Sequence, residues 1–169
     1  MDATTRLLSL VVAGLLAVTV TAFVLTPASP AMQGRDDAAA AAMLEMVNEE
    51  RARHDLAALA PASDVADVAA DWSAAMAATG EFDHNPDHAE QICCWASVAE
   101  NVAWAEAPRT RLGGDPVLQV VEELHHELLH SPGHRANLLS PGLDEIGIGV
   151  HVETDGSVWI TQNFRASAK

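Results

Sequence analysis

Tyrosine is absent from this chain of 169 residues, and cysteine, lysine and arginine are scarce. The two cysteines, Cys93 and Cys94, are adjacent, so they cannot form a disulfide framework that joins distant parts of a fold. They could bond to each other, remain free thiols or form an intermolecular bridge, and the sequence leaves these alternatives open. The stability of the domain must therefore come from packing.

Basic residues are few in relation to acidic ones. The chain has 9 Lys and Arg against 24 Asp and Glu, which gives a formal net charge of −15. A strongly acidic surface repels phosphate backbones, so we expect no nucleic-acid partner. The charge is compatible with a solvated acidic surface and with basic or cationic partners.

Charged residues are also missing from a long N-terminal run. Residues 7–25 are apolar apart from a few threonines, a serine and a glycine, and Arg6 precedes them. The next residues are small, as signal peptidase requires, up to Ala31. Residues 1–31 are therefore expected to be a cleaved export signal or, because about 20 apolar residues can span a bilayer, an N-terminal membrane anchor. Either alternative predicts a domain that is secreted or held on the outer face of the cytoplasmic membrane.

The rest of the chain has room for one domain, which we place at residues 40–169 after a spacer at 32–39. Four stretches have the spacing, caps or composition of helices. They run from Asp36 or Asp37 to about His54, from a cap at Ser63 or Asp64 to Gly80, from Ala99 to Trp104, and from Asp115-Pro116 to about His130.

Alternating apolar residues near the C-terminus predict two strands, at about 146–152 and from Val158 onward. The segment Thr154-Asp155-Gly156-Ser157 between them has the composition of a hairpin turn. Helices come first and a hairpin last, without regular alternation of strands and helices. This order predicts the α+β class.

The stretch His126-Glu127-Leu128-Leu129-His130 matches the HExxH pattern of zinc peptidases. In that pattern two histidines one turn apart hold zinc and the glutamate is the general base. On a helix with about 100° per residue, however, both histidines point away from the apolar stripe. The third ligand of the longer metzincin pattern is also missing, because Ala136 occupies its position. Two surface histidines are therefore the favoured interpretation, and a zincin-type site is the weaker alternative.

Several motifs follow one another over residues 40–165. They are Asn48-Glu-Glu-Arg51, Gly80-Glu-Phe-Asp-His84, Ala99-Glu100-Asn101, Ser131-Pro-Gly-His134-Arg-Ala-Asn137-Leu-Leu, Ile146-Gly-Ile-Gly-Val150 and Trp159-Ile-Thr-Gln162-Asn-Phe164. In this order and spacing they resemble the CAP superfamily, the SCP-like group of cysteine-rich secretory proteins, antigen 5 and pathogenesis-related-1, in its bacterial extracellular form. The resemblance implies an α-β-α sandwich with a central antiparallel sheet.

The resemblance also implies a cleft that holds His84, Glu100 and His134, which come from three separate segments. Two neutral imidazoles and a carboxylate suit a divalent cation such as Zn²⁺, with an open position for water. The second cleft glutamate of many family members is missing here, because Ser131 occupies its position. The residues expected to support the cleft or its surroundings structurally are Asn48, Arg51, Asn101, Arg135 and Asn137.

The expected function is binding in an extracellular or cell-envelope role. The cleft would take a divalent metal, a small or lipidic ligand such as a sterol, or both, and a cell-envelope component is a further expected partner. The alternative function is that of a metal-dependent hydrolase or peptidase that uses the same cleft or, less favoured, the segment 126–130. No residue is assigned a catalytic role from the sequence.

Overall fold

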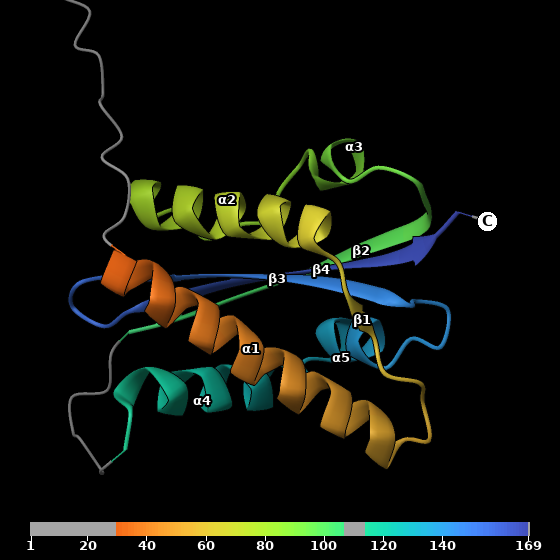
Figure 1. Cartoon of the computed structure of the whole chain (residues 1–169), viewed down its shortest axis with the longest axis horizontal. Helices are drawn as coiled ribbons and strands as arrows, with labels where there is room; N and C mark the ends of the chain where they lie inside the picture. The colour runs from red at the N-terminus through yellow and green to blue at the C-terminus, as the bar shows by residue number, and fades with distance from the viewer. Residues whose placement is uncertain (1–29, 107–113, 169) are drawn as a thin grey trace, which may run out of the picture.

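Helices cover both faces of one central sheet (Figure 1). The computed structural model describes residues 30–106 and 114–168, so the export signal or anchor predicted at residues 1–31 lies outside it up to residue 29. This arrangement confirms the predicted α+β class and α-β-α sandwich. The helices are α1 (Pro30–Arg53), α4 (Pro116–His130) and α5 (Pro132–Leu138) on one face, α2 (Ser63–Thr79) on the other, and the short α3 (His88–Gln91).

The sheet has four strands in the order β1-β3-β4-β2. Their bounds are Ala60–Pro61 for β1, Trp95–Ala105 for β2, Glu145–Val152 for β3 and Val158–Ser167 for β4. The three long strands pair antiparallel, and only the two-residue β1 runs parallel to its neighbour β3. Because β2 is last in this order, one of its two edges has no neighbouring strand in the described part of the chain.

Two helix ends follow directly from the sequence. The carboxylate of Asp115 accepts a hydrogen bond from Val117 N (2.9 Å), and Pro116 is the first residue of α4, as predicted. Gly80 ends α2 with a left-handed φ of 71°, also as predicted, since glycine adopts this conformation without steric penalty. The predicted cap of α2 was wrong, because the capping position belongs to Ala62, which has no capping side chain.

The predicted start of the first helix was also wrong. α1 begins at Pro30 rather than at Asp36 or Asp37, so residues 32–39, expected to be a spacer, are helical. Alanines at 38–42 favour helix strongly. In addition, Asp36 Oδ1 accepts a hydrogen bond from Val152 N (3.0 Å), which joins the early turns of α1 to β3. Helix propensity and this contact together extend the helix beyond its apolar stripe.

The helix predicted at 99–104 does not exist, because these residues form the middle of β2. Their pairing with β4 is continuous from Ala99↔Phe164 to Trp104↔Trp159. A long antiparallel ladder satisfies the backbone donors and acceptors of each strand on the paired side. These tertiary contacts outweigh the weak helix preference of the two alanines in the segment.

Two glycines of β3 allow α2 to lie very close to the sheet. A Cβ added to Gly147 would overlap the backbone of Val65 and Ala66, and one added to Gly149 would overlap the backbone of Ala69 and Ala70. No side chain fits between this strand and the helix. The Ile-Gly-Ile-Gly sequence of β3 therefore sets the distance between these two elements.

Gly149→Ala is expected to destabilise the protein by about 1–3 kcal/mol or more, because the new methyl group pushes α2 away from the sheet. The measurement is the free energy of unfolding in urea. Gly142→Ala is the matched control, since the nearest atom to its added Cβ would be Ser140 Oγ at 3.8 Å. Equal effects of the two substitutions would contradict the close packing of α2 on β3.

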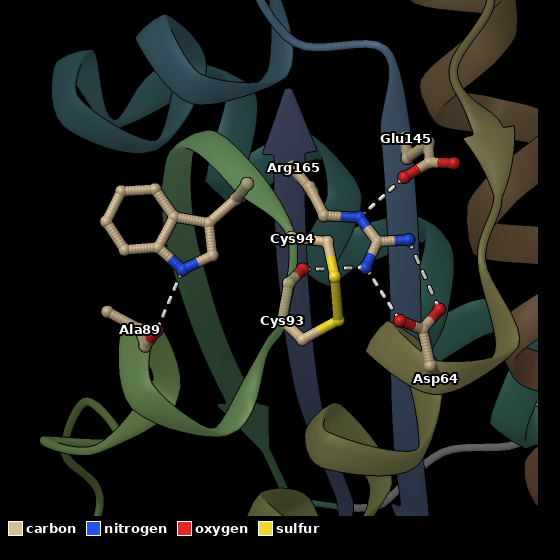
Figure 2. The surroundings of a disulfide bond; sticks show 7 residues. Asp64, Ala89, Cys93, Cys94, Glu145 and Arg165 are labelled. Carbon is tan, nitrogen blue, oxygen red and sulfur yellow. Dashed lines mark hydrogen bonds and ion pairs between the residues drawn. A yellow bond between two sulfur atoms is a disulfide. The ribbon is translucent and has the colours of Figure 1, made fainter. Parts of the chain in front are cut away.

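The end of the sheet near the cysteines is held by Arg165 of β4 (Figure 2). Its guanidinium pairs with Asp64 at the start of α2 (2.6 Å) and with Glu145 of β3, and it donates to the Cys93 carbonyl (3.1 Å). Cys93 and Cys94 are bonded to each other, which resolves the alternatives left open by the sequence. Arg165 thus connects α2, β3 and the segment before β2.

None of the helices within residues 30–106 and 114–168 is both long and apolar enough to cross a membrane.

The hydrogen bond from Arg165 lowers the pKa of the Asp64 carboxyl below its ordinary value. A lowered pKa contributes stability that is present above the unfolded-state value, near 4, and is lost as the pH falls through the folded-state value. Asp64→Asn should therefore reduce stability by less than about 1 kcal/mol at neutral pH, as for an exposed ion pair, and the difference from wild type should shrink on acidification. Thermal unfolding from neutral pH to below about pH 4 measures this stability difference, and Asp67→Asn on the same helix is the control. A difference that grows in acid would contradict a stabilising ion pair between Asp64 and Arg165.

Candidate functional site

His84 and His134 meet at the free edge of β2, although they come from opposite faces of the sheet. His84 follows α2, and His134 belongs to α5. Their ring centroids are 6.4 Å apart, with the ring planes tilted by 57°. Glu100 and Asn101 are consecutive residues of β2, and their side chains point to opposite faces of the sheet because side chains alternate along a strand. Glu100 contacts the His84 ring, and Asn101 contacts the His134 backbone.

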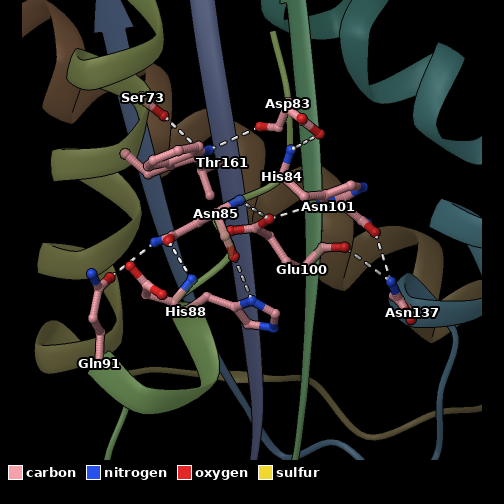
Figure 3. A network of polar contacts seen from close by, with 12 residues as sticks. Ser73, Asp83, His84, Asn85, His88, Gln91, Glu100, Asn101, Asn137 and Thr161 are labelled. Atoms are coloured by element: carbon pink, nitrogen blue, oxygen red, sulfur yellow. Dashed lines mark hydrogen bonds and ion pairs between the residues drawn. The ribbon is translucent and has the colours of Figure 1, made fainter.

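Glu100 is a buried carboxylate that orients His84 (Figure 3). Its side chain is 1% exposed, whereas that of His84 is 54% exposed. Glu100 Oε1 accepts hydrogen bonds from His84 Nδ1 (2.8 Å) and from Asn85 N (2.9 Å). Because a carboxylate only accepts, the proton of a neutral His84 lies on Nδ1 and its Nε2 is free to bind a ligand. Glu100 Oε2 is buried without a hydrogen-bond partner among the described residues.

His134 is half-buried, and burial lowers the pKa of its imidazole, with a smaller lowering from the nearby His84. Desolvation has this effect because it disfavours the charged form. A neutral imidazole is the form that binds metals. The His134 imidazole therefore has the electronic character of a metal ligand.

Two asparagines, Asn101 and Asn137, join β2 to α5 (Figure 3). Asn101 Nδ2 donates to His134 O (3.2 Å) and to Gln162 Oε1 (3.0 Å). Asn137 Nδ2 donates to Glu100 O (3.2 Å) and to Asn101 Oδ1 (2.9 Å). The Asn137 side chain, which belongs to α5, makes both of these last contacts. The position of α5 is therefore coupled to that of Glu100 and hence to that of His84.

Arg51 and its neighbours lie away from the histidines. The buried guanidinium of Arg51 donates to carbonyls of Ala57 (2.8 Å), Leu138 (2.8 Å), Ser140 (3.0 Å) and, at the limit of hydrogen bonding, Leu143 (3.5 Å). These acceptors lie in the segment after α1, at the last residue of α5 and in the chain between α5 and β3. Arg51 thus fixes the C-terminal end of α5.

The two remaining residues of the predicted support have separate contacts. Asn48 exchanges two hydrogen bonds with the backbone of Leu59, at 3.1 and 2.8 Å, and so holds the segment that leads into β1. Arg135 is exposed and its Nη2 lies 3.3 Å from His54 Nε2 at the end of α1. The structure thus joins Arg135 to α1 and not to the histidine pair.

The HExxH segment lies on the exposed side of α4, as its spacing predicted. His126, Glu127 and His130 are all exposed. The two rings stack with centroids 4.0 Å apart, and His130 Nδ1 lies 2.7 Å from the His126 carbonyl oxygen. Within the described residues, no group of three or more His, Cys, Asp or Glu side chains is arranged to hold a metal ion. The segment therefore has no third ligand there.

The same finding bears on His84, Glu100 and His134, which do not form a three-ligand group as they lie. Glu100 instead uses Oε1 to orient His84, in the way that carboxylates hold metal-binding histidines from the outer shell. The two imidazoles suit zinc, and Glu100 Oε2 is a buried acceptor without a partner in the part of the chain that the structure describes. The donor chemistry therefore fits a divalent cation held by two histidines.

Sequence reasoning missed Asn85 and a group of aromatic residues. Asn85 is buried, donates its N–H to Glu100, and bonds through its side chain to Gln91 (2.9 Å) and Asp87 (3.0 Å). Its position directly after His84 was the available signal. Phe82 lies close to Trp159, and nothing in their separate positions along the sequence indicated that contact.

The fold and the histidine pair define an α-β-α sandwich with a polar site at a sheet edge. Residues 44–164 match the family CAP, described as the cysteine-rich secretory protein family. The chain belongs to this family. A comparison with proteins of curated function finds none that is similar.

Solved structures agree with this assignment. The chain is 27% identical to an extracellular SCP-domain protein of Bacillus anthracis, with 84% of this chain and 45% of that one covered and a TM-score of 0.62. It is 26% identical to a cysteine-rich secretory protein of Staphylococcus aureus, with 78% and 40% covered and a TM-score of 0.57. It thus spans less than half the length of both. NaASP2 with Zn²⁺ shares only the fold, at 12% identity, 78% and 85% coverage and a TM-score of 0.56.

Asn137→Ala should destabilise the protein by about 1–3 kcal/mol, because it leaves the acceptors on Glu100 and Asn101 without their donor. Denaturation in urea measures the loss. Arg135→Ala, two residues earlier on the same helix, is the control and should stay within about 0.5 kcal/mol of wild type, as exposed positions do. A larger loss for Arg135 than for Asn137 would show that the asparagine bridge does not hold α5.

Proposed function

We propose that this chain is an extracellular binding module whose His84–His134 pair binds a divalent cation, with zinc as the first candidate. The observation that carries the proposal is the buried Glu100 carboxylate at 2.8 Å from His84 Nδ1. Metal-binding histidines commonly donate their second ring N–H to a carboxylate, which fixes the tautomer and orients the ring. His134, neutral and 6.4 Å away between ring centroids, supplies the second imidazole.

A cation at this position would act as a Lewis acid that attracts an anionic or polar group of a ligand. The chain's own residues orient and support it. Glu100 holds His84, Asn101 and Asn137 hold the backbone of α5, and the exposed side of His84 faces the incoming ligand. The ligand class that we propose is a small or lipidic molecule such as a sterol, or a cell-envelope component, and not a nucleic acid.

The proposed location is outside the cytoplasm, either secreted or anchored on the outer face of the membrane. The relative from Bacillus anthracis is described as extracellular and that from Staphylococcus aureus as secretory. The apolar run at residues 7–25, with the small residues after it, supports the same location for this chain.

Zinc titration of the metal-free protein by calorimetry tests the proposal. We expect one zinc to bind to wild type and binding to be lost in His84→Ala/His134→Ala. The double variant His126→Ala/His130→Ala removes the same number of imidazoles from the surface of α4 and should retain binding. Glu100→Gln should weaken binding by about 10- to 100-fold, as loss of an outer-shell partner does.

The opposite pattern would overturn the site. If zinc were lost only in the His126/His130 variant, the metal would be held by the HExxH segment. Absence of binding to the wild type would leave the histidine pair without a metal role. Unfolding curves of each variant separate loss of binding from loss of fold.

A further inference from the structure

The free edge of β2 carries a pocket that borders the proposed cation site, because His134 belongs to both. It has a volume of about 240 Å³, which is below the roughly 300–1,000 Å³ of small-molecule sites. Its size suits a single side chain better than a whole ligand. The residues that line it are Phe82, Val102, Ala103, Trp104, Leu124, Glu127, Leu128, Ser131 and His134.

Backbone groups of β2 point out of the sheet at this pocket. Asn137 reaches the Glu100 carbonyl from the α5 side, while β4 pairs along the other side of the strand. Backbone groups alternate in direction along an antiparallel strand. The N–H and C=O groups of Val102 and Trp104 therefore point to the same free edge as the Glu100 carbonyl. In the described residues, no strand lies beyond this edge.

Aromatic side chains stand beside these backbone groups. Phe82 is 53% exposed and Trp104 is 39% exposed. Both pack on Trp159, with ring centroids 6.5 and 5.2 Å away. The chain has only three Phe and four Trp, so two exposed rings against one pocket are a marked concentration. Aromatic faces attract the cationic groups of lysine and arginine.

The charges around the pocket have one sign. Glu127 lines it directly, and Glu81 and Asp83 flank Phe82 and line the neighbouring hollow that also contains His84. Among the described residues that line either hollow, there is no lysine or arginine. With a net charge of −15 for the chain, a cationic partner would be steered toward this surface.

We propose that the free edge of β2 binds an extended basic peptide. The peptide adds as a short strand at Trp104, the exposed residue of this edge, while the buried Val102 and Ala103 line the pocket. In this recognition mode backbone hydrogen bonds give affinity and pockets select alternate side chains. One lysine or arginine side chain enters the pocket between the aromatic rings and Glu127. The pocket shares His134 with the proposed cation site, but peptide binding does not require a cation on the histidines.

A fluorescent peptide of alternating arginine and threonine, titrated with the full chain at low ionic strength in EDTA, tests the proposal. Binding is followed by anisotropy and should weaken as salt is added. Two further peptides carry N-methyl groups on every second amide, in one phase or the other. We expect one of them to lose binding and the other to keep it, since only alternate amides face the strand.

Matched variants locate the site. Trp104→Leu should weaken binding roughly 2- to 30-fold, the range of cation–π contacts, while Trp95→Leu at the other end of β2 should not. Glu127→Gln should weaken it several-fold, while Glu122→Gln on the same helix should not. Because Glu127 is exposed, its substitution preserves the test if Trp104→Leu fails to fold.

Four binding results would overturn the proposal. They are equal loss with Glu122→Gln and Glu127→Gln, equal binding of the two methylated peptides, equal binding of a peptide with glutamine in place of arginine, and no binding at all. A stable dimer in gel filtration that excludes the peptide would instead assign the edge to a second copy of the chain and would also overturn it.

Discussion

The fold depends on one buried cation, the guanidinium of Arg51. It donates to backbone carbonyls before β1, at the last residue of α5 and between α5 and β3, so it joins segments far apart in the sequence. No carboxylate pairs with it in the part of the chain that the structure describes. Burial lowers the pKa of Arg51, yet an arginine stays charged in proteins. A buried charge is tolerated only with hydrogen-bonding partners, so these carbonyls must stay in place, and with them the end of α5.

The consequence reaches the site through α5. His134 lies in the same short helix whose last residue, Leu138, is bound by Arg51. The other end of the connection is Asn137, which bonds to the backbone of Glu100 and to the side chain of Asn101. A helix of two turns has little stability of its own. Its position, and therefore the distance between the two histidines, is set by these polar contacts on either side.

Much of the fold could be predicted because its signals are local. Asp115-Pro116 specifies the start of α4, and the alternating residues around Gly156 specify the β3–β4 hairpin. The segment 99–104 was misassigned because its alanines favour helix, whereas its strand pairs with residues some sixty positions later. Local preference carries no information about that partner.

The site was predictable to a similar extent. The motifs indicated His84, Glu100 and His134, and the structure places Glu100 against His84 and the two rings near each other. They did not indicate that Glu100 Oε1 would accept hydrogen bonds from His84 and Asn85, so that the carboxylate does not offer both oxygens to a metal ion. That detail depends on how deeply the carboxylate is buried. The pocket at the edge of β2 could not be predicted from the sequence either. Phe82, Trp104 and Glu127 are far apart along the chain and line one pocket only because β2 is an edge strand.

The position of β2 at the sheet edge also relates the two proposed sites. His134 lines the pocket that would take a basic side chain, and it is half of the proposed cation site. Two positive charges in adjacent positions repel each other, more strongly where water is excluded. Glu127 beside the pocket and Glu81 and Asp83 beside His84 offset that repulsion. The acidity of the chain, which favours solubility in general, would then have a specific role at this edge: it allows a cation and a basic peptide to be bound side by side.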